Sequence, residues 1–279
     1  MKQLATLLPE CVEIARLAGL AIMDIYTTDF TVEHKADDSP LTRADLASHQ
    51  VIVDKLRALT PDIPVLSEES AAIDWDTRQR WQRYWLIDPL DGTKEFVKRN
   101  GEFTVNIALI DAHRPVLGVV LAPVLLSCWF AASGQAAQRL RPASLQQPFS
   151  MTDADNISVR QPAAKPPVVI ASRSHVSPEL QHYLQQLPEH EILSAGSSLK
   201  FCRVAEGNAD LYPRLGPTSE WDTAAAQAVV EQAGGQVLKA DGEALDYNRK
   251  ASLLNPYFLV CGDSSYPWPC LPLEEINQI

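Results

Sequence analysis

Two aspartates three residues apart close a strand-like segment of aromatic and branched side chains. Because such a segment favours burial, Asp88 is delivered at the end of a strand rather than on an exposed loop. Pro89 interrupts ladder hydrogen bonding and predicts a turn, which frees the Leu90 carbonyl to point the same way as Asp88 and Asp91. Carboxylate and carbonyl oxygens are the ligands that Mg²⁺ and Mn²⁺ prefer. The segment therefore predicts a site for a hard divalent cation.

The residues after Asp91 are suited to binding an anion. Gly92 permits close approach of backbone N–H groups. Residues 93–98 predict a short helix, and its N-terminus would point toward the aspartates, where a phosphate belongs. Taken alone, however, an aspartate followed by a glycine is more often an ordinary turn.

Further acidic residues follow apolar elements elsewhere in the chain. Glu68 and Glu69 end an apolar stretch that begins at Pro64, and Asp222 lies at the start of a predicted helix that ends at a glycine pair. Each has a simpler interpretation, an exposed loop for the glutamates and a helix N-cap for Asp222. Together they fit these interpretations less well, because converging carboxylates repel one another unless a cation lies between them.

These segments resemble, in order and spacing, the signature motifs of the inositol monophosphatase superfamily, a group of lithium-sensitive, Mg²⁺-dependent phosphomonoesterases. The motifs are Ser-Glu-Glu at 67–69, Asp-Pro-Leu-Asp-Gly-Thr at 88–93, Trp-Asp-Thr-Ala-Ala at 221–225 and an N-terminal motif at 35–45. The resemblance covers about residues 4–262. Segments at 99–110, 172–175 and 196–202 are most similar to the bacterial 3'(2'),5'-bisphosphate nucleotidase branch.

The resemblance implies a set of metal ligands. One Mg²⁺ would be held by Glu69, Asp88 and the Leu90 carbonyl. A second would be held by Asp88, Asp91 and Asp222, so that Asp88 bridges the two ions. Two or three Mg²⁺ per site are expected, with Mn²⁺ able to substitute and Li⁺ inhibitory.

The resemblance also implies catalytic and substrate-binding residues. Thr93 and Asp45 would orient and help to deprotonate the attacking water, with Glu69 as a third catalytic residue. The substrate contacts would come from Glu69, Gly92, Thr93, His175, Ser197, Lys200, Arg214 and Asp222. Lys200 and Arg214 adjoin apolar or aromatic residues that could form a wall for a nucleobase, although Lys200 could equally be an exposed helix lysine.

The function implied by the resemblance is hydrolysis of adenosine 3',5'-bisphosphate (PAP) to AMP and phosphate, linked to sulfur assimilation. The sulfated nucleotide PAPS is a further candidate substrate. An inositol-1-phosphate or inositol polyphosphate phosphatase is the enzymatic alternative. A metal-dependent nucleotide-binding module is the non-enzymatic alternative, and residues 266–279 could then be a loosely packed docking segment.

The formal net charge of −11 disfavours general nucleic-acid binding. Such a surface would normally repel a small anionic substrate as well, but two bound divalent ions would reverse the sign of the potential locally, so a preference for anions would depend on the metal. The five cysteines are scattered, as is typical of a reducing compartment. We expect no signal peptide and no transmembrane segment, and a cytoplasmic protein that could associate peripherally with the inner membrane.

The helices and strands expected to position these residues indicate a layered α+β sandwich of the sugar-phosphatase type. It would have alternating helix and sheet layers and two lobes. Amphipathic helices are expected at about 4–25 and 42–59, and an antiparallel sheet within 103–140. A proline-rich linker at 161–167 suggests an N-terminal lobe, 1–160, that carries most ligands. The C-terminal α/β lobe, 161–279, would carry Asp222 and the substrate contacts.

Overall fold

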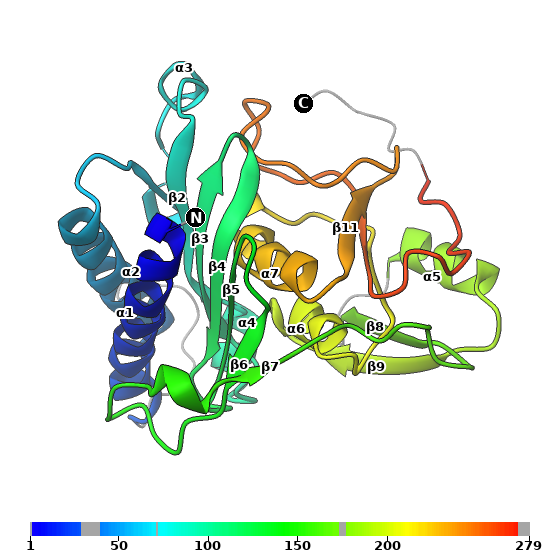
Figure 1. The fold of residues 1–279 in the computed structure, drawn as a ribbon, viewed down its shortest axis with the longest axis horizontal. Helices are drawn as coiled ribbons and strands as arrows, with labels where there is room; N and C mark the ends of the chain where they lie inside the picture. The colour runs from blue at the N-terminus through cyan, green and yellow to red at the C-terminus, as the bar shows by residue number, and fades with distance from the viewer. Residues whose placement is uncertain (1, 29–39, 71, 173–176, 273–279) are drawn as a thin grey trace.

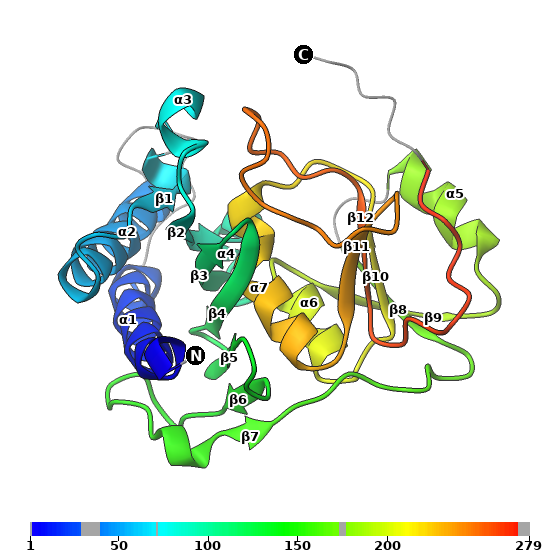
Figure 2. The ribbon, with the colours of Figure 1, turned by 45° about the horizontal axis from the view of Figure 1, so that its top comes forward.

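The computed structural model describes residues 2–28, 40–70, 72–172 and 177–272 as alternating helix and sheet layers (Figures 1 and 2). Helices α1 (Lys2–Tyr26) and α2 (Pro40–Leu59) cover one face of a seven-stranded sheet. Helices α6 (Leu199–Ala205) and α7 (Glu220–Gln232) lie between this sheet and a five-stranded one, whose outer face is covered by α5 (Pro178–Gln186). The predicted layered sandwich is confirmed.

The first sheet has the strand order β1-β2-β3-β4-β5-β6-β7, with β1 parallel to β2 and all other pairs antiparallel. Its strands are β1 (Val65–Ser67), β2 (Arg83–Asp91), β3 (Thr104–Asp111), β4 (Arg114–Ala122), β5 (Ser127–Ala132), β6 (Gln138–Leu140) and β7 (Asp155–Asn156). The segment between β1 and β2 contains the 3₁₀ turn η1 (Glu68–Ser70) and α3 (Trp75–Arg78), α4 (Thr93–Val97) follows β2, and η2 (Met151–Asp153) precedes β7.

The second sheet has the order β11-β12-β10-β8-β9. Its strands are β8 (Val168–Ser172), β9 (Glu191–Ala195), β10 (Leu211–Arg214), β11 (Gln236–Lys239) and β12 (Phe258–Cys261). This half therefore has the α/β character predicted from the sequence. The division into two lobes stays a prediction, because one continuous core of buried side chains includes both sheets and α7.

The side chains of β2 alternate between two cores, which decides where its polar end points. Tyr84 and Leu86 belong to the core that contains α7, whereas Trp85 and Ile87 belong to the core under α1 and α2. All four side chains are buried. By this alternation Asp88 must project toward α7.

The turn predicted at Pro89 is wrong in detail, because β2 continues to Asp91 through a β-bulge. Asp88 pairs with Asn106 and Asp91 with Thr104, so two residues of β2 oppose a single residue of β3. A bulge is one of the few places where a strand tolerates a proline, since the missing N–H falls where pairing is already broken. The Pro89 carbonyl accepts a hydrogen bond from Ser48 Oγ at 2.7 Å.

The C-terminal segment is better packed than the sequence suggests. Over the described residues 263–272, Trp268 Nε1 donates to the Asp263 carbonyl at 2.8 Å, and Tyr183 Oη donates to the Pro269 carbonyl at 3.0 Å. Leu271 is buried in the core under α5. None of the helices in the described ranges is both long and apolar enough to cross a membrane.

The contact between β4 and α7 gives a first prediction, Gly118→Ala. A Cβ at Gly118 would lie 2.1 Å from the backbone oxygen of Ala225, so α7 would have to move away from the sheet. We expect a loss of about 1 to 3 kcal/mol in the free energy of unfolding, the usual effect of overpacking. Denaturant unfolding measures it, with Gly216→Ala as the control because nothing lies within 4 Å of the corresponding Cβ. Equal stability of both variants would contradict the close approach.

Candidate metal and phosphate site

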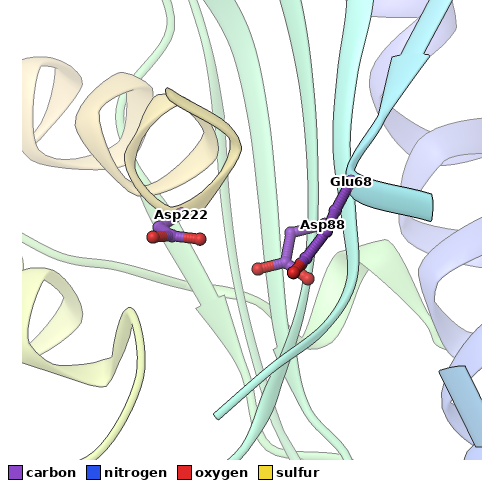
Figure 3. A group of neighbouring side chains, drawn as sticks. All are labelled: Glu68, Asp88 and Asp222. Atoms are coloured by element: carbon purple, nitrogen blue, oxygen red, sulfur yellow. The ribbon is translucent and has the colours of Figure 1, made fainter. Parts of the chain in front are cut away.

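Three carboxylates from distant parts of the chain meet between the two halves of the molecule. One oxygen each of Glu68, Asp88 and Asp222 lies within 4.8 Å of the others. Figure 3 shows Glu68 and Asp88 side by side at the end of the β1 and β2 strands, with Asp222 facing them from the start of α7. The structure thus brings Asp88 and Asp222 together, as predicted from the sequence.

The register of β1 and β2 explains why Glu68 belongs to this group. In this parallel pair Leu66 lies beside Leu86 and Ser67 beside Ile87, and Glu68 and Asp88 directly follow these partners. Leu66 and Leu86 both face the core that contains α7, and the carboxylates of Glu68 and Asp88 meet on that side, close to Asp222. The family resemblance implies Glu69 as the ligand, whereas the structure places the carboxylate of Glu68 in this group.

The bulge in β2 explains why Asp91 faces the same way as Asp88. In a regular strand, residues three apart point to opposite faces, and one extra residue restores the same face. Asp91 Oδ2 accepts a hydrogen bond from the Ser198 N–H at 2.6 Å and one from Thr104 Oγ1 at 3.5 Å. Asp91 is therefore held toward the start of α6 and lies next to the group.

Asp222 serves as a helix cap and still faces the other acids. Its Oδ2 accepts a hydrogen bond from the backbone N–H of Ser219, the N-cap residue of α7, at 2.9 Å. The sequence suggested that Asp222 itself is the N-cap, whereas it lies at the third helical position and reaches back to the N-cap in a capping box. Because the same carboxylate also approaches Glu68 and Asp88, capping fixes its orientation and does not exclude binding of a cation.

Crowding raises the pKa of these carboxyls. Burial raises the pKa of Asp88 well above its usual value, and the nearby Asp91, Glu68 and Asp222 raise it further. Burial and the charge of Asp91 raise the pKa of Asp222 to about 7. Asp88 Oδ2 is buried with no hydrogen-bond partner among the described residues. An all-oxygen donor set with an unpartnered buried oxygen fits a hard divalent cation such as Mg²⁺ or Mn²⁺.

Glu69 does not belong to this group of carboxylates, and it lies next to Asp45 of α2. Burial, the charges of Glu69 and Glu68 and a hydrogen bond with Glu69 together raise the pKa of Asp45 to about 8. Asp45 Oδ1 is buried without a hydrogen-bond partner in the described part of the chain. Thr93 begins α4 and is exposed. The structure shows no hydrogen bond between Thr93 and Asp45 within the described ranges, so the predicted pair stays a prediction.

A cavity of about 170 Å³ opens beside Asp91 and Asp222. Of the residues predicted to bind substrate, Gly92, Ser197, Lys200, Arg214 and Asp222 line it. A second cavity, of about 380 Å³, shares Lys94, Tyr212 and Arg214 with the first and extends it along apolar residues of β10 and α5. The two together have room for a ligand considerably longer than one phosphate.

The two cationic side chains predicted to bind substrate, Lys200 and Arg214, differ in their surroundings. Lys200 is 6% exposed, and its Nζ donates to the carbonyl of Ser197 at 2.6 Å and lies over the Tyr212 ring. Burial lowers the pKa of Lys200 to about 8, although Asp91 opposes this shift. The Arg214 side chain reaches Thr218 Oγ1 and the Pro217 carbonyl. The interpretation of Lys200 as an exposed helix lysine is therefore wrong.

Among the predicted site residues, Leu90 does not line either cavity, and the first cavity also has lining residues that were not predicted. His175 lies outside the described residues, and Leu90 lies in the bulge, buried, so its carbonyl remains a predicted ligand. Lys94 and Ser198 line the first cavity and were not predicted from the sequence. Each directly follows a predicted site residue, and that adjacency was the one local signal for it. Tyr212, one of the aromatic residues expected to form a nucleobase wall beside Arg214, also lines the cavity.

Comparison with known proteins places this arrangement in a family. A sequence profile described as the Inositol monophosphatase family matches residues 3–262. The 3'(2'),5'-bisphosphate nucleotidase CysQ of Escherichia coli O6:H1 is 56% identical over 256 residues, which cover 91% of this chain and 99% of that protein. The protein of the same name from Aggregatibacter actinomycetemcomitans is 40% identical over 266 residues, 94% of this chain and 95% of that protein.

Solved structures agree with the sequence comparison. The crystal structure of CysQ from Bacteroides thetaiotaomicron has a TM-score of 0.81 at 42% identity and covers 91% of this chain and 96% of that one. An inositol monophosphatase from Zymomonas mobilis has a TM-score of 0.71 at 22% identity, with 90% of each chain covered. The latter shows the fold alone.

The raised pKa values predict how the stability of the metal-free protein depends on pH. An acid whose pKa is higher in the folded than in the unfolded state binds more protons when folded, so the stability it gives is lost as the pH rises through the folded value. For Asp222 and Asp45 these values are about 7 and about 8. We therefore expect the free energy of unfolding in EDTA to fall from pH 5 to pH 9.

Asp88→Asn removes one of the repelling charges and should reduce this fall by at least about 1.4 kcal/mol, the equivalent of one pKa unit. Urea unfolding across the pH range measures it. Asp155→Asn, at an exposed position 72% accessible, is the control and should follow the wild type. Identical slopes for wild type and Asp88→Asn would show that the carboxylates do not repel one another.

Proposed function

The chain belongs to the inositol monophosphatase family, and we propose that it is a 3'(2'),5'-bisphosphate nucleotidase that hydrolyses PAP to AMP and phosphate. The observation that carries this proposal is the group of carboxylates formed by Glu68, Asp88 and Asp222, of which Asp222 also lines a cavity together with Lys200 and Arg214. The name and the high identity of the CysQ relatives over nearly their full length support it. A role in sulfur assimilation follows as part of the proposal.

The carboxylates are proposed to bind Mg²⁺, with Mn²⁺ able to substitute and Li⁺ inhibitory. The proposed ligands are Asp88, Asp91, Asp222, the Leu90 carbonyl and Glu68, which takes the place that the sequence gave to Glu69. Divalent cations held there would neutralise charge on the phosphate and favour deprotonation of the attacking water.

The residues around the proposed ligands have positioning roles. The Ser198 N–H fixes Asp91, and the Ser219 N–H fixes Asp222, so both carboxylates are oriented before a cation binds. Glu69 and Asp45 lie next to each other on the α2 side of the site. We propose that this pair, with Thr93, orients the attacking water, as the family resemblance implies.

The choice between Glu68 and Glu69 can be tested with one substitution at each position. Because the carboxylate of Glu68 meets that of Asp88, Glu68→Gln should weaken Mn²⁺ binding by about tenfold or more. Glu69→Gln should leave Mn²⁺ affinity nearly unchanged and lower kcat. Calorimetric titration of the metal-free protein and steady-state rates supply the two readouts. The assignment is wrong if Glu69→Gln weakens Mn²⁺ binding and Glu68→Gln does not.

The cationic side chains of the cavity, Arg214 and Lys200, are proposed to bind the second phosphate of the substrate. Arg214 lines both cavities and presents a guanidinium, which pairs with phosphate through two parallel hydrogen bonds. Lys200 Nζ donates to the carbonyls of Ser197 and Ala195, which leaves one of its three N–H donors, together with its charge, for the phosphate. A bisphosphonucleotide would thus place one phosphate at the carboxylates and the other near Arg214.

A panel of phosphate esters, assayed with and without Mg²⁺, tests the function. We expect the highest kcat/KM on PAP, at least about tenfold above inositol 1-phosphate, and no turnover in EDTA. Arg214→Ala should raise KM for PAP by about tenfold, equivalent to about 1.4 kcal/mol, and change KM for AMP-like monophosphates much less. A preference for inositol phosphates would support the alternative phosphatase. Binding of PAP without release of phosphate would support a nucleotide-binding module.

We also propose that the protein works in the cytoplasm. All five cysteines, Cys11, Cys128, Cys202, Cys261 and Cys270, are free thiols, which suits a reducing compartment. Peripheral association with the inner membrane remains part of this proposal only as an expectation from the resemblance.

A further inference from the structure

A buried chain of three polar side chains joins the two halves of the molecule near the carboxylates. Its members are Arg78, at the end of α3, Asn248, in the loop between β11 and β12, and Glu220, the first residue of α7. They are 2%, 1% and 2% exposed, respectively. Figures 1 and 2 show this loop reaching from the second sheet toward α3. None of the three lines the cavities described above.

The link between Glu220 and Asn248 fixes the first turn of α7. Both carboxylate oxygens of Glu220 accept a hydrogen bond from the backbone N–H of Asn248, each at 3.0 Å. Asn248 adopts a left-handed backbone conformation, φ +55°, which asparagine tolerates better than most residues. Because Glu220 is two residues before Asp222, this anchor acts directly on the part of the helix that carries the metal-site carboxylate.

The link between Asn248 and Arg78 reaches the segment that begins with Glu68. Arg78 Nη1 donates to Asn248 Oδ1 at 2.8 Å, and Asn248 Nδ2 donates back to the Arg78 carbonyl at 2.6 Å. Arg78 also donates to the Lys250 carbonyl at 3.3 Å and to the Ala251 carbonyl. Arg78 lies at the far end of the segment between β1 and β2, and Glu68 lies at its start.

The apolar packing of α7 does not by itself fix the position of the helix along its axis. The helix presents Ala224, Ala225, Ala226 and Ala228 to its surroundings, and it approaches β4 closely at Gly118. Apolar burial is non-directional, and small side chains interlock little, so this contact resists separation better than sliding along the helix axis. Hydrogen bonds are directional and fix a position along that axis.

We propose that Arg78, Asn248 and Glu220 are positioning residues that set the distance of Asp222 from Glu68 and Asp88, and so the metal affinity of the site. The inference rests on the proposed metal site. Mg²⁺ demands near-ideal ligand geometry, so a small displacement of one carboxylate weakens binding. The three residues therefore act on the cation without touching it.

The test compares two arginines of the first half of the molecule that each bond to the second half. Arg78→Lys keeps the charge and loses the forked contacts to the loop. Arg139→Lys is the control, because the largely covered Arg139 side chain pairs with Glu206 at the end of α6, at 2.6 Å, away from the carboxylates. Mn²⁺ affinity of the metal-free proteins is measured by calorimetry, and stability in EDTA by thermal unfolding.

We expect Arg78→Lys to weaken Mn²⁺ binding by about tenfold, the size typical of losing an outer partner of a metal ligand, and Arg139→Lys to leave it within about twofold. Both variants should lower Tm. Equal Mn²⁺ affinity of Arg78→Lys and wild type, or equal weakening in both variants, overturns the proposal. Failure of the wild type to bind Mn²⁺ would instead overturn the metal site itself.

Asn248→Gly provides a second, independent variant if Arg78→Lys does not fold. Glycine adopts the same positive φ and keeps the backbone N–H that Glu220 accepts, so only the link to Arg78 is removed. The expected loss of Mn²⁺ affinity is again about tenfold. A folded Asn248→Gly with wild-type affinity overturns the proposal. A failure of both variants to fold also overturns it, since the three linked side chains would then serve stability alone.

Discussion

Mutual repulsion among carboxylates that meet around the buried Asp88 is the constraint on which the rest of the structure depends. Acids from η1, β2 and the start of α7 converge within 4.8 Å, and burial of Asp88 weakens the screening of its charge by solvent. The fold holds the three acids together through two sheets, a shared core and a helix packed between them, and the Ser219 N–H orients Asp222. A cation bound between the carboxylates would relieve this repulsion, which favours its binding.

Much of this could be predicted from the sequence because the signals are local. The apolar run before Asp88, the glycine pair after α7 and the periodicity of α1 and α2 each lie within one element, and all gave elements that the structure confirms. The convergence of Asp88 and Asp222 was also predictable, since carboxylates that follow several buried elements are best explained by a common partner.

The rest depends on register and on contacts between distant residues, which a sequence does not display. Glu68 and Glu69 are chemically alike and adjacent, and only the pairing of β1 with β2 places Glu68 beside Asp88. Asn248 is an unremarkable loop residue until its contact with Arg78, 170 positions away, is seen. Likewise Pro89 suggested a turn, because a proline within a strand is expected only where pairing is interrupted.

The bulge after Asp88 has a consequence for which changes this segment can tolerate. The bulge fixes the number of residues between the aspartates: with two positions between them, the one extra residue on β2 lets both carboxylates reach the same face. The oxygen that Leu90 would offer belongs to the backbone, which every amino acid provides, but its side chain is buried in the core under α1 and α2, so a smaller residue there would cost stability. A single insertion would turn Asp91 toward the opposite core, whereas a single deletion would remove the bulge and leave the aspartates two residues apart, on the same face of a regular strand.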